Sequence, residues 1–531
     1  MYKGDIMHKF FKAVAFVTIF SVLTRAMGFF LRIYLSRVMG AEALGAYQVS
    51  VSIFGVLMTL ISSGLPLVVS RNVAFYNNQN NKSMQNKNIT AGLIISVAIS
   101  VILCAVLFAF PNILKLFINS DESISIILVL LPALVASAIY AILRGGLWGK
   151  KCFFTISFTE FFEQVARIII CIILFSIPMG ISVGQKTALS LTLSCVVSAL
   201  LVAVLYFVFG GRLENPKTTF SSVLKTSTPI TLVRTLSSVL GSLIAIIIPA
   251  RLMAYGYTQA EALAQFGIIM GMTMPIIMIP NTFVGSIAVA LVPELSGHTN
   301  NIDKYGVKNF SELSSQVTSA ITTTIVIAFI LMSSFISLGK PIGVFLFNNA
   351  QAGEYLMMGA VLMLPMCLNQ ICTSMLNAIG LELKGLGCYA IGAVALFISI
   401  IFLPKYIGAY SVLVGLGLMH TITCILGLKM LKKRKLINWS FFKTMGICAL
   451  ICAPTALLGT FVYNLFIKFT SLFVSLAVSG ILTVIFTILL MFVFNIADIK
   501  VLLAKIVPKR LKKHRRDTFN IKIKHTKKLP T

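Results

Sequence analysis

The chain has 531 residues, of which 58% are apolar and 11% charged, and its formal net charge is +29. Its mean hydropathy is +0.96. Soluble domains usually contain about 45–50% apolar and about 25% charged residues, so this composition excludes an ordinary soluble enzyme, a disordered chain and a secreted disulfide-bonded scaffold. We therefore predict an all-α polytopic membrane protein.

Apolar runs bounded by charged residues, proline and asparagine predict about fourteen membrane-spanning helices, since about 20 residues cross a bilayer as a helix. The first run follows Lys9 and Lys12, as in a signal peptide. It is longer than a signal segment and contains arginines, so we interpret it as a membrane helix. The predicted spans are 10–36, 45–69, 90–110, 124–147, 153–177, 185–209, 226–250, 263–291, 313–338, 355–380, 386–403, 408–428, 442–465 and 470–495.

Lysine and arginine are distributed unevenly among the loops that join these spans. With the N-terminus in the cytoplasm, the inner segments contain 33 of the 44 basic residues and the outer loops contain 7. Cytoplasmic loops of membrane proteins carry the excess of Lys and Arg. The distribution predicts a multi-pass protein of the cell membrane with both termini cytoplasmic.

A basic tail follows the last span, at residues 496–531. Beside a membrane such a run attracts anionic lipid headgroups, and we expect that partner rather than nucleic acid. The ten cysteines form no CxxC pair and the five histidines are scattered, so we expect neither a metal site nor a cofactor. The chain has no P-loop and no long soluble loop, which indicates a transporter rather than an enzyme or an ATP-driven pump.

Two regions of the chain share an order of features. In each, an arginine lies within a span, a second lies at its outer end, and the sequence Ala-Glu-Ala-Leu follows, at 41–44 and 260–263. Six spans separate the copies, so both have the same orientation and the repeat is parallel. We predict two six-helix lobes, 1–209 and 210–430, around a central cavity, with helices thirteen and fourteen (431–495) outside the repeat.

Ionisable side chains within membrane helices are costly and usually face a cavity or a partner. Arg25 and Arg32 lie two turns apart on one face of the first span, with Gly28 between them as a point of close approach. Arg234 lies in the seventh span. Neither helix contains an acidic residue, so these arginines suit an anionic group such as a diphosphate, which guanidinium binds bidentately. In the alternative interpretation, Arg32 reaches the outer interface and Arg25 binds backbone carbonyls.

The fifth span carries Glu163 and Arg167 four residues apart, a spacing typical of a structural pair on one helix face. Glu160 is left without an expected partner near the cytoplasmic end. Arg144, at the end of the preceding helix, is interpreted as a topology anchor rather than a ligand.

The eighth span is interrupted by Pro275, Pro280 and Gly285. Each proline removes a backbone hydrogen bond and bends a helix. This helix is therefore either a hinge of a transport cycle or passively kinked, since membrane helices tolerate such residues.

Several of these stretches resemble helix one and later motifs of the polysaccharide-transporter branch of the MOP superfamily, near its stage V sporulation protein B type and the MurJ type of lipid II flippase. The motifs that carry the resemblance are Leu23–Phe29, Leu35–Ala41, Gly64–Pro66, Leu143–Gly145, Glu163–Arg167, Gly285 and Val292–Ser296.

This resemblance implies a MATE-like fold of fourteen helices in two lobes, and export of undecaprenyl-diphosphate-linked sugars across a bacterial membrane. It also implies a groove for the polyprenyl tail at helices thirteen and fourteen. Arg25 matches a cavity arginine of the family. Arg32 does not align cleanly, and the arginine of the second helix of lipid II flippases has no counterpart within 45–69.

The sequence therefore favours a flippase for a lipid-linked oligosaccharide used in peptidoglycan, spore-cortex or polysaccharide synthesis. A Na⁺ or H⁺ gradient or the membrane potential would drive it, and cell-wall synthesis enzymes are further expected partners. One alternative is a MATE-type multidrug exporter, although helices one, two, seven and eight offer no carboxylate for a cationic drug. The other is a scaffold that recruits cell-wall enzymes without transport.

Overall fold

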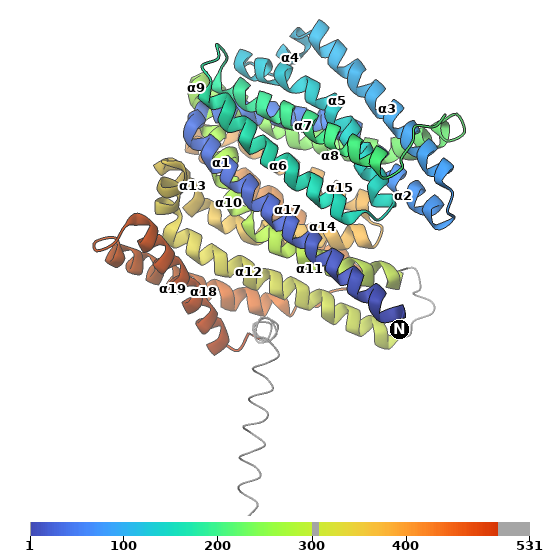
Figure 1. Ribbon diagram of the computed structural model, residues 1–531. Helices are drawn as coiled ribbons and strands as arrows, with labels where there is room; N and C mark the ends of the chain where they lie inside the picture. Colours follow the sequence, from blue (N-terminus) through green and yellow to red (C-terminus); the bar gives the residue numbers. More distant parts are fainter. Residues whose placement is uncertain (1, 300–306, 497–531) are drawn as a thin grey trace, which may run out of the picture. The chain divides into compact units, whose positions relative to one another are not determined.

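The computed structural model describes residues 2–299 and 307–496, which are helical with short connections and contain no β-strand (Figure 1). The basic tail expected at 496–531 lies outside this range apart from its first residue. The helices are α1 (Tyr2–Ser62), α2 (Leu65–Asn78), α3 (Lys82–Ala109), α4 (Asn112–Lys115), α5 (Asp121–Gly149), α6 (Phe153–Ser176), α7 (Val183–Val208), α8 (Phe220–Ala254), α9 (Gln259–Phe266), the π-helix η1 (Gly267–Thr273), α10 (Met274–Ile277), α11 (Ile279–Thr299), α12 (Val307–Phe347), α13 (Ala350–Gly359), the 3₁₀-helix η2 (Ala360–Leu362), α14 (Met363–Ala378), α15 (Glu382–Phe402), α16 (Pro404–Ile407), α17 (Tyr410–Lys433), α18 (Phe441–Phe466) and α19 (Leu472–Val493).

Twelve helical segments in the described ranges are long and apolar enough to cross a membrane. The first, Ile19–Asn78, covers most of the predicted span 10–36 and all of the predicted span 45–69. Between them lies Gly40, in the positive-φ backbone conformation that glycine adopts without strain (φ 75°). α6 is not among the twelve and carries three charged side chains. Dividing the first segment at Gly40 and adding α6 gives fourteen, so the prediction of a polytopic helical membrane protein is confirmed.

The eighth predicted span is not one continuous helix, in keeping with the interruption expected from its prolines and glycine. Whether it acts as a hinge or is passively kinked stays a prediction. The segment begins as α9, widens into the π-helix η1 and continues as α10. A break at Met278 then separates α10 from α11. Pro275 and Pro280 lack the amide hydrogens that a regular ladder needs. A Cβ atom at Gly285 would meet no atom within 4 Å, so close packing does not explain this glycine.

The two Ala-Glu-Ala-Leu segments lie against each other where α1 crosses α9 and η1. A Cβ atom at Gly45 would lie 1.9 Å from the carbonyl oxygen of Leu263, and one at Gly267 would lie 2.2 Å from that of Ala41. Any larger residue at either glycine would force the helices apart. The segments that suggested the repeat are therefore also the site of a close backbone crossing.

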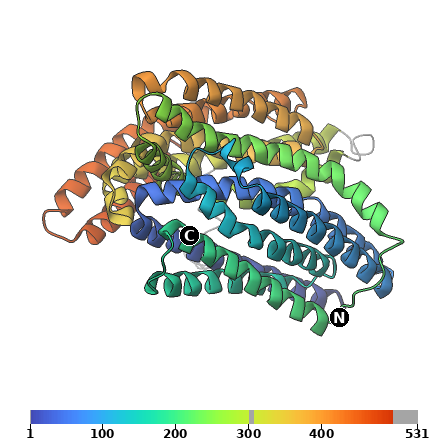
Figure 2. The ribbon, with the colours of Figure 1, turned by 90° about the horizontal axis from the view of Figure 1, so that it is seen from above.

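The helices form two compact units, each interleaved along the chain. Unit 1 comprises residues 1–276, 346–355 and 389–419, and its helices α5 and α7 pack side by side along their length (Figure 2). A core of fully buried side chains joins α2, α3 and α5, including Val69, Ile89 and Ile142.

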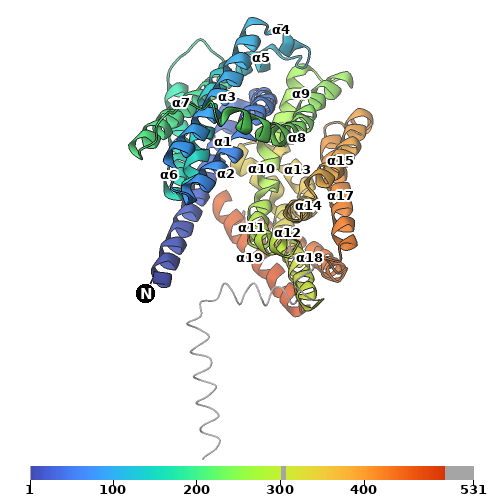
Figure 3. The same ribbon diagram turned by 90° about the vertical axis from the view of Figure 1, so that its right-hand side faces the viewer.

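Among the described residues, unit 2 comprises 277–299, 307–345, 356–388 and 420–496, and within it α18 packs against α19 (Figure 3). The contact between α18 and α19 is made by small side chains, with Gly459 against Thr483. Small residues let membrane helices approach closely, as at this seam.

Candidate functional site

α1 carries the two arginines expected in a cavity. Arg25 and Arg32 are both exposed, and neither forms a hydrogen bond or ion pair within the described part of the chain. A Cβ atom at Gly28 would lie 3.7 Å from the side-chain nitrogen of Gln164, so α6 contacts α1 between the two arginines. The interpretation that Arg25 binds backbone carbonyls has no support in these contacts.

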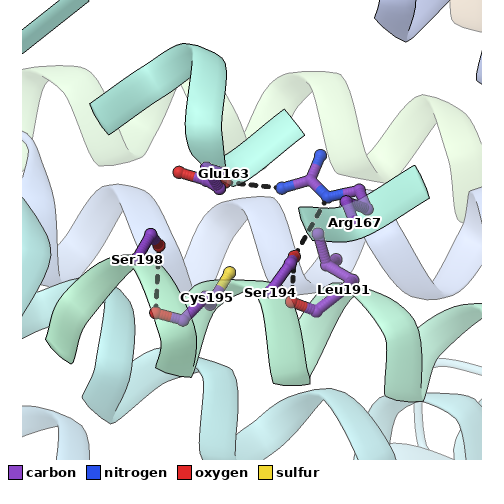
Figure 4. A network of polar contacts seen from close by, with 6 residues as sticks. All are labelled: Glu163, Arg167, Leu191, Ser194, Cys195 and Ser198. Atoms are coloured by element: carbon purple, nitrogen blue, oxygen red, sulfur yellow. Dashed lines mark hydrogen bonds and ion pairs between the residues drawn. The ribbon is translucent and has the colours of Figure 1, made fainter. Parts of the chain in front are cut away.

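The predicted pair on α6 is present and is part of a larger network (Figure 4). The guanidinium of Arg167 lies 2.6 Å from the carboxylate of Glu163, and the two side chains are 24% and 21% exposed. The Nε of Arg167 also donates to the hydroxyl of Ser194 on α7, at 3.2 Å. Ser194 in turn donates to the carbonyl oxygen of Leu191. Arg167 therefore joins α6 to α7 as well as neutralising Glu163.

A second ion pair joins α5 to α6, between Arg144 and Glu160. The sequence interpretation left Glu160 without an expected partner, and that expectation was wrong. The interpretation of Arg144 as a topology anchor rather than a ligand stays a prediction, because an ion pair with Glu160 is compatible with either role. The short connection after Gly149 makes α5 and α6 antiparallel neighbours, so residues at similar distances from the turn meet. That spacing was the available signal.

Other polar groups surround these pairs. Arg32 and Arg167 both lie within electrostatic reach of the hydroxyl of Tyr47 on α1. The hydroxyl of Tyr140 and the Nε of Arg144 are buried and have no hydrogen-bond partner among the described residues. Arg144 and Arg167 form ion pairs with the two glutamates of α6, and no ion pair compensates the charge of Arg25 or Arg32 among the described residues.

Arg234 on α8 lies at a different kind of position. It is exposed, and its Nη1 donates to the carbonyl oxygen of Ser63 at 3.1 Å, at the break between α1 and α2. One hydrogen bond leaves most of the N–H groups of a guanidinium available. No contact joins Arg234 to Arg25 or Arg32 in the described ranges, so the convergence of all three stays a prediction.

Arg37 and Arg251, the second arginine of each predicted repeat, also bind backbone. Arg37 donates to the carbonyl oxygen of Leu346 at 2.7 Å, and Arg251 donates to that of Ile401 at 3.2 Å. Such carbonyls at helix ends lack intrahelical partners. No group of three or more His, Cys, Asp or Glu side chains in the described ranges could hold a metal ion.

The family model described as "Polysaccharide biosynthesis protein" matches residues 10–298. The chain is 25% identical over 301 residues to "Stage V sporulation protein B" of Bacillus subtilis (strain 168). This alignment covers 54% of this chain and 58% of that protein. It is 24% identical over 351 residues to "Uncharacterized membrane protein YabM" of the same organism, covering 64% of each. The chain thus spans about three fifths of the length of these curated relatives.

Two solved structures share the fold. "Lipid II flippase MurJ, inward closed conformation" superposes with a TM-score of 0.64 at 17% identity, covering 90% of this chain and 98% of that one. An inward-facing "multidrug resistance MATE family transporter of the MOP superfamily" superposes with a TM-score of 0.63 at 19% identity, covering 79% and 94%. The predicted MATE-like fold is therefore confirmed.

Proposed function

Because the chain belongs to the polysaccharide biosynthesis protein family, we propose that it moves an undecaprenyl-diphosphate-linked oligosaccharide from the inner to the outer leaflet of a bacterial cell membrane. The observation that carries the proposal is the uncompensated pair Arg25 and Arg32 on one exposed face of α1. Unpaired guanidinium groups at membrane depth are costly unless an anion or water meets them. The cargo's diphosphate is such an anion.

The geometry supports these arginines as the diphosphate site. A guanidinium matches two phosphate oxygens at once, and charge-assisted hydrogen bonds of this kind are roughly twice as strong as neutral ones. Arg234 would complete the site with the N–H groups that Ser63 does not use. Gly28 would allow α1 and α6 to stay close during the transport cycle, and the broken segment from Gly267 to Gly285 would serve as its hinge.

The membrane potential is the driving force that the charges favour. An elementary charge that crosses 100 mV changes its free energy by about 2.3 kcal/mol, and a negative interior assists the export of an anion. A Na⁺ or H⁺ gradient is the alternative. The proposal includes cytoplasmic termini, anionic lipids around the basic tail and cell-wall synthesis enzymes as users of the product.

Two other functions fit the contacts less well. A cation-coupled drug exporter needs a free carboxylate in its interior, whereas the carboxylates of Glu160 and Glu163 are both bound by arginine. A scaffold that does not transport gives no reason for unpaired arginines on α1.

Transport can be tested with the full chain in proteoliposomes that contain undecaprenyl diphosphate linked to a disaccharide. We expect the protein to expose the glycan to a membrane-impermeant lectin, and Arg25→Ala to abolish most of this movement at normal abundance. Arg434→Ala, which removes an exposed cytoplasmic charge, is the matched control. Equal rates for Arg25→Ala and the control would contradict the diphosphate site, and no movement by the wild type would contradict the function.

A further inference from the structure

The helix α14, in unit 2, exposes a polar face where a membrane helix usually exposes an apolar one. Its apolar side chains are the buried ones. The side chains turned away from that core over its second half include Asn369, Gln370, Thr373 and Asn377, all exposed or half-buried. The segment 355–381 contains no Asp, Glu, Lys or Arg, so this face is neutral.

The helix α19 of the same unit shows the usual pattern. α19 exposes Ile481, Ile485 and Leu489, and its serine and threonine side chains at 475, 479, 483 and 487 are buried. An amide placed in hydrocarbon without a partner costs several kcal/mol. The exposed amides of α14 therefore face an aqueous space rather than lipid.

The contacts on this face prepare it for a hydrogen-bonding ligand. The amide nitrogen of Asn369 lies 3.2 Å from Nδ1 of His420, and the hydroxyl of Thr373 donates to its amide oxygen at 3.3 Å. The side chain of Asn369 is thus held in place. The amides of Gln370 and Asn377 form no hydrogen bond within the described ranges and are available to a ligand.

A second observation comes from α11, which packs against α14. The side-chain oxygen of Asn281 on α11 is buried and lacks a hydrogen-bond partner among the described residues. Buried acceptors are nearly always satisfied, so this oxygen marks a further polar position with unused hydrogen-bonding capacity on a helix adjacent to α14.

We propose that the polar face of α14 (Asn369, Gln370, Thr373 and Asn377), with His420, binds the sugar hydroxyls of the lipid-linked glycan. The proposal rests on the proposed function and assigns the glycan to a site separate from the diphosphate. An amide offers both donors and an acceptor, as a sugar hydroxyl does, and no charge competes for ions. Residues 369, 373 and 377 follow one helix face for about 12 Å, which suits a short oligosaccharide.

The test compares two lipids in proteoliposomes, undecaprenyl diphosphate with a neutral disaccharide and undecaprenyl diphosphate alone. Exposure of the first is measured with a lectin and of the second with an added phosphatase. We expect Gln370→Ala/Asn377→Ala to slow the disaccharide lipid about tenfold and to leave the bare lipid within about twofold, since only the former loses hydrogen bonds. Neither amide contributes to internal hydrogen bonding, so the fold should be retained.

Thr455→Val, which removes a hydroxyl bonded within α18, is the matched control and should change neither rate. If the double variant slows both lipids equally, or neither, α14 only lines an aqueous space and the glycan site is overturned. A wild-type protein that moves the bare lipid but not the disaccharide lipid would overturn it too. Failure of the wild type to move either lipid would instead refute the proposed function on which the site depends.

Discussion

The helices α5 and α6 differ sharply in chemistry from α14 and α15, which hold the same places in the second predicted repeat. α5 and α6 carry four interior charges, arranged as the pairs Arg144–Glu160 and Glu163–Arg167. The segments 355–381 and 386–403 carry none and offer amides and hydroxyls instead. Two helix pairs at corresponding places in the predicted repeat thus differ in side-chain chemistry, with ion pairs in one case and neutral polar groups in the other.

The ion pairs of α5 and α6 are also more rigid than the exposed amides of α14. An ion pair between neighbouring helices is costly to break, because removal of one partner leaves the other charge without compensation. Neutral amides on an exposed face can exchange water for hydroxyl groups at little cost. The ion pairs therefore fix α5 and α6 relative to each other, whereas the exposed amides of α14 are free to bind water or a ligand.

The largest expected effect is on the transport rate of variants that remove an arginine of α1. Arg25→Ala and Arg32→Ala should each slow both the disaccharide lipid and the bare lipid by roughly 10- to 100-fold, because a charge-assisted hydrogen bond contributes about 1.5–3 kcal/mol. Arg25→Lys should recover only part of the rate, since an ammonium keeps the charge without the bidentate geometry. Lectin and phosphatase accessibility in proteoliposomes measure both rates. If these arginine variants slowed only the disaccharide lipid and not the bare lipid, the arginines would act on the glycan, and the assignment of diphosphate and glycan to different sites would be contradicted.

A smaller effect is expected on stability. Glu163→Gln leaves Arg167 unpaired and should lower the free energy of unfolding by about 2 kcal/mol, below the range for fully buried pairs because both side chains are partly exposed. Glu163→Gln/Arg167→Gln should recover most of the loss. Thermal unfolding of the purified protein in detergent measures both, with Gln370→Ala as a control that leaves stability unchanged. A double variant as unstable as the single one would show that the pair is not a unit.

Arg234→Ala sharpens the comparison between the two arginines placed in equivalent spans. Arg234 binds the carbonyl oxygen of Ser63, whereas Arg25 has no such bond in the described part of the chain. We expect Arg234→Ala to cost about 1 kcal/mol of stability, the usual worth of one hydrogen bond. Its transport rate should fall less than that of Arg25→Ala. The free energy of unfolding and the transport rate should be measured on the same preparation of each variant. An equal loss of transport in Arg234→Ala and Arg25→Ala would instead indicate that both arginines bind the same ligand.

The smallest effect on transport is expected from single cysteine substitutions in the loops, which serve only to report the orientation of the chain in the membrane. In a parallel repeat, Lys186→Cys and Lys405→Cys lie in equivalent outer loops and should both react with a membrane-impermeant maleimide added from outside. Lys151→Cys and Lys384→Cys should react only after permeabilisation. A Cys152→Ser background is needed, because Cys152 is the one cysteine that is not buried. Opposite labelling of Lys186→Cys and Lys405→Cys would contradict a parallel repeat.

Several features followed from the sequence because they depend on local periodicity and composition. Apolar runs of membrane length predicted the helical spans. Within α1, two predicted spans follow each other without a loop, and the kink between them is at Gly40, a residue that adopts positive φ freely. The pair Glu163–Arg167 was predictable because residues four apart share a face on any α-helix. These features need no knowledge of what packs against the helix.

Only the tertiary structure decided which groups meet across helices. The pairing of Arg144 with Glu160 and the bond from Arg234 to Ser63 depend on which helices are neighbours, and no local period encodes that. The same holds for α14. Its sequence shows where amides and apolar residues alternate, but whether its polar side faces protein, lipid or water is determined by the helices that cover its apolar side.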